Sequence, residues 1–172
     1  MKTTLNQIRA QSPCADGWAK LLKYLNKTTA DDEPLSLTTI LESNGLGDTL
    51  WCLRAVEGFD KEKRLLAVSF AREVQHLMSD PRSIDTLDVA ERFANGETTL
   101  EELGAASAAA SAAYYAASTF YAASTFYAAY AAYAAASAVR DAAYYAASAA
   151  ADASVRGDMQ QKQIEIFKKF MV

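Results

Sequence analysis

Side chains that could perform chemistry are few in this chain, and they do not form a recognisable catalytic pattern. His76 is the single histidine, so neither a histidine-based metal site nor a histidine relay can be assembled. Cys14 and Cys52 could act as nucleophiles only beside a general base, for which His76 is the one candidate. The sequence has no glycine-rich phosphate loop, no CxxC pair and no nucleophile elbow. We therefore expect no enzymatic activity, no metal site and no cofactor.

Two groups of carboxylates fit structural positions better than catalytic ones. Residues 31–33 (Asp-Asp-Glu) lie in a polar stretch between two expected helices. Glu101 and Glu102 follow Thr98 and Thr99, where they complete a capping box and interact favourably with the dipole of a helix start. We expect neither group to do acid-base chemistry.

Aromatic side chains are the better candidates for a binding role. From residue 105 to residue 154 the chain has 27 alanines, eight of its nine tyrosines, and only three ionic residues. Tyrosine offers a large contact area at little entropic cost, so we expect about half of these tyrosines to pack internally and the others to form a recognition surface. The residues expected to contact a partner or a second copy of the chain are Tyr115, Phe120, Tyr121, Phe126, Tyr127, Tyr130, Tyr133, Tyr144 and Tyr145.

The alanine-tyrosine tract is predicted to be helical throughout, because alanine has the highest helix propensity and the tract lacks glycine and proline. A single helix of this length would measure about 75 Å, whereas a globule of about 100 residues is roughly 30–35 Å across. Either the tract breaks into antiparallel helices that pack on the rest of the chain, or it pairs with the same tract of another chain. Candidate breaks are residues 118–119, 124–125 and 137–141, where short polar side chains compete for backbone groups.

Apolar side chains would cover most of the circumference of such a helix, which predicts an inner position in a bundle or a membrane span. A span is not expected, because alanine, serine and tyrosine are only marginally apolar and no basic cluster flanks the tract. Drawn as one helix, Tyr115, Phe126, Tyr133 and Tyr144 lie along one side.

Before the tract, capping residues and apolar spacing predict short helices, and no segment shows the alternation of a strand. The expected helices span residues 12–25, 34–44, 48–58, 60–78 and 81–95, and a sixth begins at Thr98 or Thr99 and enters the tract. A last amphipathic helix follows Asp158 and is expected to pack back on the bundle. The predicted fold is all-α, with a compact region at 1–97, a helical bundle or hairpin at 98–156 and a C-terminal helix at 158–172.

The charge and the termini limit the expected partners and compartment. The net charge of −4 and the scattered basic residues make nucleic acid an unlikely partner. The start of the chain has no apolar core of a secretory signal, so we expect a cytoplasmic protein with reduced thiols.

Residues 44–58, 71–78 and 88–96, followed by the alanine-rich tail, resemble a family of uncharacterised bacterial and phage proteins. The tail is also similar to the alanine-rich helical region of proposed immunity proteins, although family members often carry arginine where this chain has serine, tyrosine and phenylalanine. The resemblance implies a role in conflict between phages and bacteria, and it implies no reaction.

These observations predict a non-catalytic protein that binds another macromolecule. We expect an immunity-like or phage anti-defence inhibitor that occludes a protein partner. The alternative is a structural protein that self-assembles through the alanine-tyrosine tract, and we expect homo-oligomers in either case.

Overall fold

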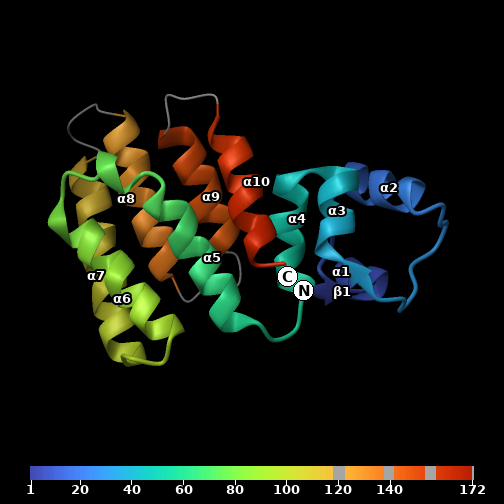
Figure 1. Cartoon of the computed structure of the whole chain (residues 1–172), viewed down its shortest axis with the longest axis horizontal. Helices are drawn as coiled ribbons and strands as arrows, with labels where there is room; N and C mark the ends of the chain where they lie inside the picture. The colour runs from blue at the N-terminus through green and yellow to red at the C-terminus, as the bar shows by residue number, and fades with distance from the viewer. Residues whose placement is uncertain (118–122, 138–141, 154–157, 172) are drawn as a thin grey trace. The chain divides into compact units, whose positions relative to one another are not determined.

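The computed structural model describes residues 1–117, 123–137, 142–153 and 158–171, with the side chains of Ala123 and Phe126 left out (Figure 1). In these ranges the chain is helical except for connecting loops and one pair of two-residue strands. The expected all-α class is therefore confirmed. The chain divides into two compact units, which comprise residues 1–59 with the last two residues, and residues 60–170. The boundary expected at residue 97 lies inside the second unit, because the helices on either side of it pack together.

Unit 1 is built from short elements around a small apolar core. They are β1 (Lys2–Thr3), α1 (Leu5–Ala10), α2 (Ala15–Tyr24), β2 (Leu35–Ser36), α3 (Leu37–Asn44), α4 (Leu46–Cys52) and the 3-10 turn η1 (Leu53–Ala55). The core contains Leu5, Ile8, Leu37 and Ile40, each at most 1% exposed. The strands pair antiparallel, with Lys2 opposite Ser36 and Thr3 opposite Leu35.

Three details of unit 1 differ from the prediction. The strand pair contradicts the expectation of no strands, and two residues per strand are too few to show an alternating pattern. Helix α1 was not predicted, although Thr4 caps it by accepting a hydrogen bond from the backbone N–H of Gln7. Helix α4 begins at Leu46 rather than at Asp48, because Gly45 (φ 91°) both ends α3 and precedes α4.

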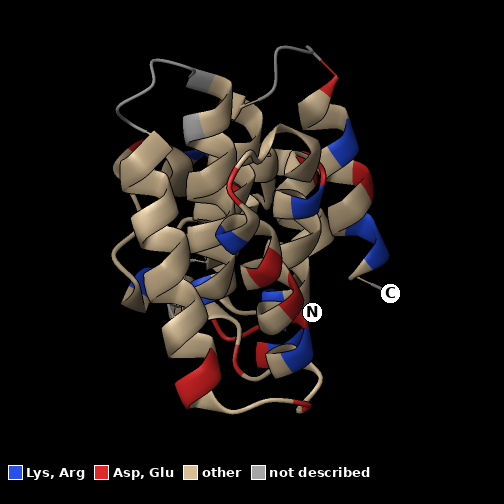
Figure 2. Ribbon diagram, turned by 90° about the vertical axis from the view of Figure 1, so that its left-hand side faces the viewer, with Lys and Arg blue, Asp and Glu red and all other residues tan. Residues whose placement is uncertain are grey.

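Unit 2 is a helical bundle. Its elements are α5 (Asp60–Arg72), the 3-10 turn η2 (Gln75–Leu77), α6 (Pro81–Ala94), α7 (Leu100–Ala117), α8 (Ala123–Ala136), α9 (Ala142–Ala153) and α10 (Met159–Lys169). Helix α5 ends six residues earlier than expected, where the chain tightens into η2. The ribbon of α7, α8 and α9 carries little blue or red in Figure 2, as the near absence of charge from the tract predicts.

The alanine-tyrosine tract forms three separate helices, α7 to α9, which pack on one another and on α5 and α6. Of the two alternatives left open by the sequence, the structure has the tract folded back within its own chain. Of the three candidate breaks, residues 118–119 and 138–141 lie outside the described residues, whereas residues 124–125 lie inside α8, so that candidate was wrong. The side shared by Tyr115, Phe126, Tyr133 and Tyr144 on one continuous helix does not exist, because these residues belong to three helices.

Helix α8 is the inner element of the bundle. It packs against α5, α6, α7 and α9. Seven of its alanines are buried: Ala128, Ala129, Ala131, Ala132, Ala134, Ala135 and Ala136. Small side chains allow neighbouring helix axes to approach closely, so a helix without a polar side suits this central place.

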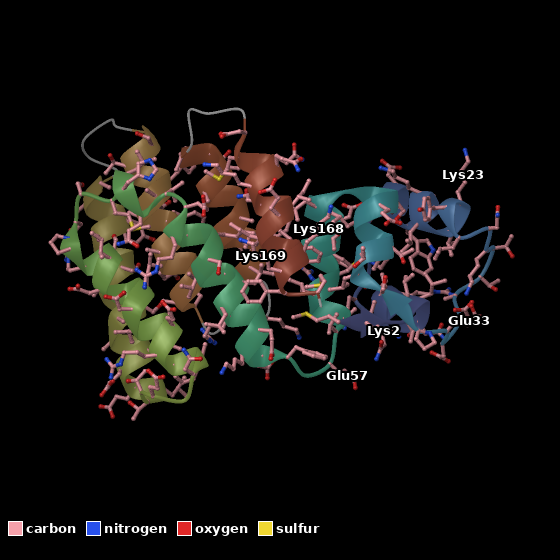
Figure 3. All side chains as sticks on the ribbon, in the orientation of Figure 1. Lys2, Lys23, Glu33, Glu57, Lys168 and Lys169 are labelled. Atoms are coloured by element: carbon pink, nitrogen blue, oxygen red, sulfur yellow. The ribbon has the colours of Figure 1, made fainter. Side chains whose placement is uncertain are left out.

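The C-terminal helix α10 packs on α5 and α9, as expected. Met159 and Phe167 are buried, and the buried amide of Gln163 donates a hydrogen bond of 2.7 Å to the carbonyl of Ala147 on α9. Lys168 and Lys169 are exposed near its end (Figure 3). Within the described ranges, no helix combines the length and apolar character that crossing a bilayer requires.

Candidate binding surface on the alanine-tyrosine helices

One side of α8 is left open by its neighbours. Helices α7, α6, α5 and α9 each pack on α8, and each packs on the next one in this order. No comparable contact joins α7 to α9 among the residues that the structure describes. The neighbours of α8 therefore form an arc with a gap between α7 and α9.

Tyrosine rings line up along this gap. The rings of Tyr114 on α7 and Tyr130 on α8 have their centroids 5.2 Å apart with planes tilted by 42°. The rings of Tyr130 and Tyr133 follow at 6.2 Å and 36°. Tilted pairs at such distances are favourable aromatic contacts. We call Tyr114, Tyr115, Tyr130, Tyr133 and Tyr145 the tyrosine surface.

A half-open pocket of about 160 Å³ lies between α8 and α9. It is lined by Tyr130, Tyr133, Ala134, Ser137, Ala142 and Tyr145. Among the described residues the lining consists of aromatic rings, methyl groups and hydroxyls, and it includes no ionised side chain. The pocket is therefore suited to a small group that contacts aromatic faces and hydrogen-bonds to phenols.

The tyrosines of this surface differ in how far their side chains are exposed to solvent. Tyr115 is 67% exposed and Tyr145 is 43% exposed, although both side chains are large and mostly apolar. Tyr114, Tyr130 and Tyr133 are only half-buried, so their rings combine internal contacts with solvent access. The described tyrosines therefore do not divide into a packed half and an exposed half, as expected. Their exposed fraction instead varies across one surface.

The phenol of Tyr130 is the most constrained of this group. Partial burial raises its pKa above the ordinary value, and the neighbouring phenols of Tyr145, Tyr114 and Tyr133 raise it further because phenolates repel one another. Tyr130 stays protonated at neutral pH and can donate a hydrogen bond.

Arg64 of α5 holds the end of α8 next to the pocket. Its guanidinium donates a hydrogen bond of 3.2 Å to the carbonyl of Ser137 and lies 4.9 Å from the ring centre of Phe93 on α6. Burial lowers the pKa of Arg64, and nearby Asp60 acts in the opposite direction. A charged donor at the C-terminal end of a helix is favourable, so Arg64 fixes a helix end that lines the pocket.

The structure brings together only part of the predicted set of contact residues. Tyr115, Tyr130, Tyr133 and Tyr145 share the tyrosine surface. Tyr127 and Tyr144 are half-buried on α8 and α9, and the ring of Tyr144 lies 5.4 Å from that of Tyr145. Phe120, Tyr121 and the side chain of Phe126 lie outside the described residues.

Three residues of the site were missed by sequence reasoning: Tyr114, Ser137 and Arg64. Tyr114 seemed to face away from the others because the tract was drawn as one helix, and a break after residue 117 removes that constraint. Ser137 was considered only as a helix breaker. Nothing in the sequence pairs Arg64 with a helix end 73 residues further along the chain.

The two cysteines and the histidine considered first lie in different settings. Cys52 is buried, and burial, followed by the charge of Asp48, raises its pKa to about 12. Cys14 is an exposed free thiol, and His76 is exposed on η2. Among the described residues no three histidines, cysteines or carboxylates are placed to hold a metal ion.

The fold and this surface define an all-α protein with an alanine-rich bundle and a tyrosine-lined opening. No protein-family model, curated protein or solved structure matches the chain.

Proposed function

We propose that this chain is a non-catalytic protein that binds a partner protein through its tyrosine surface. The observation that carries the proposal is the exposure of Tyr145, which lines the pocket, and of Tyr115, whose ring lies 5.2 Å from that of Tyr114, on helices that already cover one another. Tyrosines in such a position are typical of the residues that dominate binding energy at protein interfaces. The setting is that of an immunity-like or phage anti-defence inhibitor, which acts by occluding its partner.

The scaffold supports binding over self-assembly as the use of this surface. The sequence left self-assembly through the tract open as the alternative. In the structure α8 is covered by α5, α6, α7 and α9, and the buried side chains of the tract are alanines. The exposed tyrosines are therefore not needed to complete the bundle, and a partner of another kind can use them.

Capture of a partner by tyrosine-substituted variants tests the proposal. The chain carrying both Tyr115→Ala and Tyr145→Ala should fold normally, because alanine favours helix and both side chains are exposed. We expect it to lose a protein that the unaltered chain captures from lysate of the source cells. With the purified partner, each substitution should weaken binding by at least about tenfold, which corresponds to about 1.4 kcal/mol.

The matched control is Tyr24→Ala. Tyr24 is 51% exposed but lies on α2 of unit 1, outside the tyrosine surface. This variant should capture the same protein as the unaltered chain. Equal capture by the double variant and the control would overturn the proposal, and capture of a second copy of the chain alone would favour the self-assembling alternative.

A further inference from the structure

The pocket of the tyrosine surface has the chemical character of an aromatic cage. The rings of Tyr130 and Tyr133 stand 6.2 Å apart and tilted by 36°, so they form two adjoining walls rather than a stacked pair. Tyr145 from α9 adds a third ring to the lining. The face of an aromatic ring carries partial negative charge, and several faces around one small volume attract a cation.

The charges of the surrounding helices favour the same kind of ligand. Within the bounds of α7, α8 and α9 the ionic residues are Glu101, Glu102 and Asp152, all acidic and exposed. The whole chain also has a net charge of −4. A net negative charge attracts cationic groups and steers a basic partner towards the chain.

The nearby cation Arg64 does not occupy the pocket. It reaches the carbonyl of Ser137 from α5 and lies against Phe93 of α6, on the side of α8 that α5 and α6 cover. The described lining comes from α8, the adjoining Ser137 and α9, and Tyr114 of α7 lies next to Tyr130. The aromatic faces that line the pocket are therefore not taken up by this guanidinium.

We propose that the pocket receives the cationic end of a lysine or arginine side chain of the partner protein, held by cation-π contacts with Tyr130, Tyr133 and Tyr145. This inference rests on the proposed function and names the chemistry of the partner residue at its centre. A volume of about 160 Å³ accommodates one alkylammonium or guanidinium group. The tyrosine hydroxyls can hydrogen-bond to the partner's backbone, whereas the Ser137 hydroxyl already donates to the carbonyl of Tyr133 at 2.9 Å.

Titration of the full-length chain with a small cation tests the inference without the partner. The probe is choline chloride, and its neutral analogue 3,3-dimethylbutan-1-ol has carbon in place of the charged nitrogen. We expect choline to shift the NMR signals of the Tyr130, Tyr133 and Tyr145 rings saturably, at constant ionic strength set with sodium chloride. The neutral analogue should bind at least about tenfold more weakly, because it lacks the attraction of a cation to the ring faces.

Variants distinguish ring contact from general attraction to an acidic protein. Tyr145→Leu should weaken choline binding about tenfold, whereas Tyr145→Phe keeps the ring and should bind within about twofold of the unaltered chain. Tyr24→Leu serves as the control and should change nothing. Tyr133→Leu removes a different ring, so that the test does not depend on the folding of a single variant. Circular dichroism checks that each variant is folded.

Bound choline should also lower the pKa of Tyr130, because a cation beside the hydroxyl favours the phenolate. Equal binding of choline and its neutral analogue, unchanged binding in Tyr145→Leu and Tyr133→Leu, or the absence of saturable binding would overturn the inference.

The two proposals fail separately. If choline does not bind but the double alanine variant still loses the captured partner, only the inference that the pocket receives a cationic side chain is wrong. If choline binds but the double variant keeps the partner, the pocket is a cation site and the proposed function is wrong.

Discussion

At Gly17 the backbone of α2 lies against the side chain of Asp48 from α4, so that an added side chain would have to displace it. A Cβ atom at this residue would lie 2.8 Å from Oδ2 of Asp48 and 3.1 Å from Sγ of Cys14. The Asp48 carboxylate is not free to move away, because the Asn44 amide donates to it at 2.8 Å and also to the Gly17 carbonyl at 2.9 Å. Glycine at this position is therefore a requirement of the packing of α2.

Replacing Gly17 tests this close approach. Gly17→Ala should lower the free energy of unfolding by about 1–3 kcal/mol, since the added methyl overpacks the contact and displaces Asp48. The measurement is urea denaturation followed by circular dichroism. Gly47→Ala on α4 is the control, because nothing lies within 4 Å of its Cβ position, and it should be neutral or slightly stabilising. Equal effects of the two substitutions would show that α2 and α4 do not approach as described.

The two thiols should differ in reactivity, as their surroundings predict. Ellman's reagent should modify Cys14 in the folded protein and reach Cys52 only after unfolding, because burial keeps the Cys52 thiol protonated and inaccessible. Cys14→Ser should abolish the reaction of the folded chain. Rapid modification of Cys52 in that variant would contradict the burial of α4.

The raised pKa of Cys52 also fixes the sign of a pH dependence. The ordinary value of 9.0 in the unfolded chain rises to about 12 on folding, so the folded state retains its proton longer. Its contribution to stability is complete below pH 9 and is lost as the pH rises towards 12. Cys52→Ala should remove that part of the alkaline loss of stability, measured by denaturation at a series of pH values.

At the scale of elements, the central place of α8 depends on the smallness of its side chains. Ala132 is fully buried where α8 meets its neighbours, whereas Ala112 is exposed on α7. Ala132→Leu should therefore lower the free energy of unfolding by about 1–3 kcal/mol or more, since the close-packed helices have no space for three further carbons. Ala112→Leu is the matched control and should stay within about 0.5 kcal/mol of the unaltered chain in thermal and urea denaturation. Tolerance of leucine at both positions would contradict the packing of α8.

Much of this arrangement of helices could be predicted from the sequence, because it depends on local signals. Asp80 and Pro81 mark the start of α6, and Asn44 with Gly45 marks the end of α3. The length of the tract excluded a single helix inside one domain, and its lack of a polar side indicated an inner element. The positions of the tyrosines could not be predicted, because a break after residue 117 changes which side of α8 faces Tyr114. The role of Arg64 depends on a contact between distant segments, for which a single sequence carries no signal.

In the molecule as a whole, buried alanines form the scaffold of the bundle and tyrosines form an exposed surface. Seven alanines of α8 and all alanines of α9 except Ala151 are buried within unit 2, whereas Tyr115 and Tyr145 are the exposed tyrosines among its described residues. A chain that covers its own tract needs no second copy to be stable. The mass of the protein in solution therefore bears directly on whether the tyrosine surface is available to a different partner.

Light scattering of the purified chain over a range of concentrations tests this central claim most directly. In contrast to the homo-oligomer expected from the sequence, a bundle that covers its own tract predicts a mass of 18.6 kDa at all concentrations, with the tyrosines exposed on a monomer. An assembly that dissociates in the Tyr115→Ala and Tyr145→Ala double variant, but not in Tyr24→Ala, would contradict it, because the tyrosine surface would then bind a second copy of the same chain.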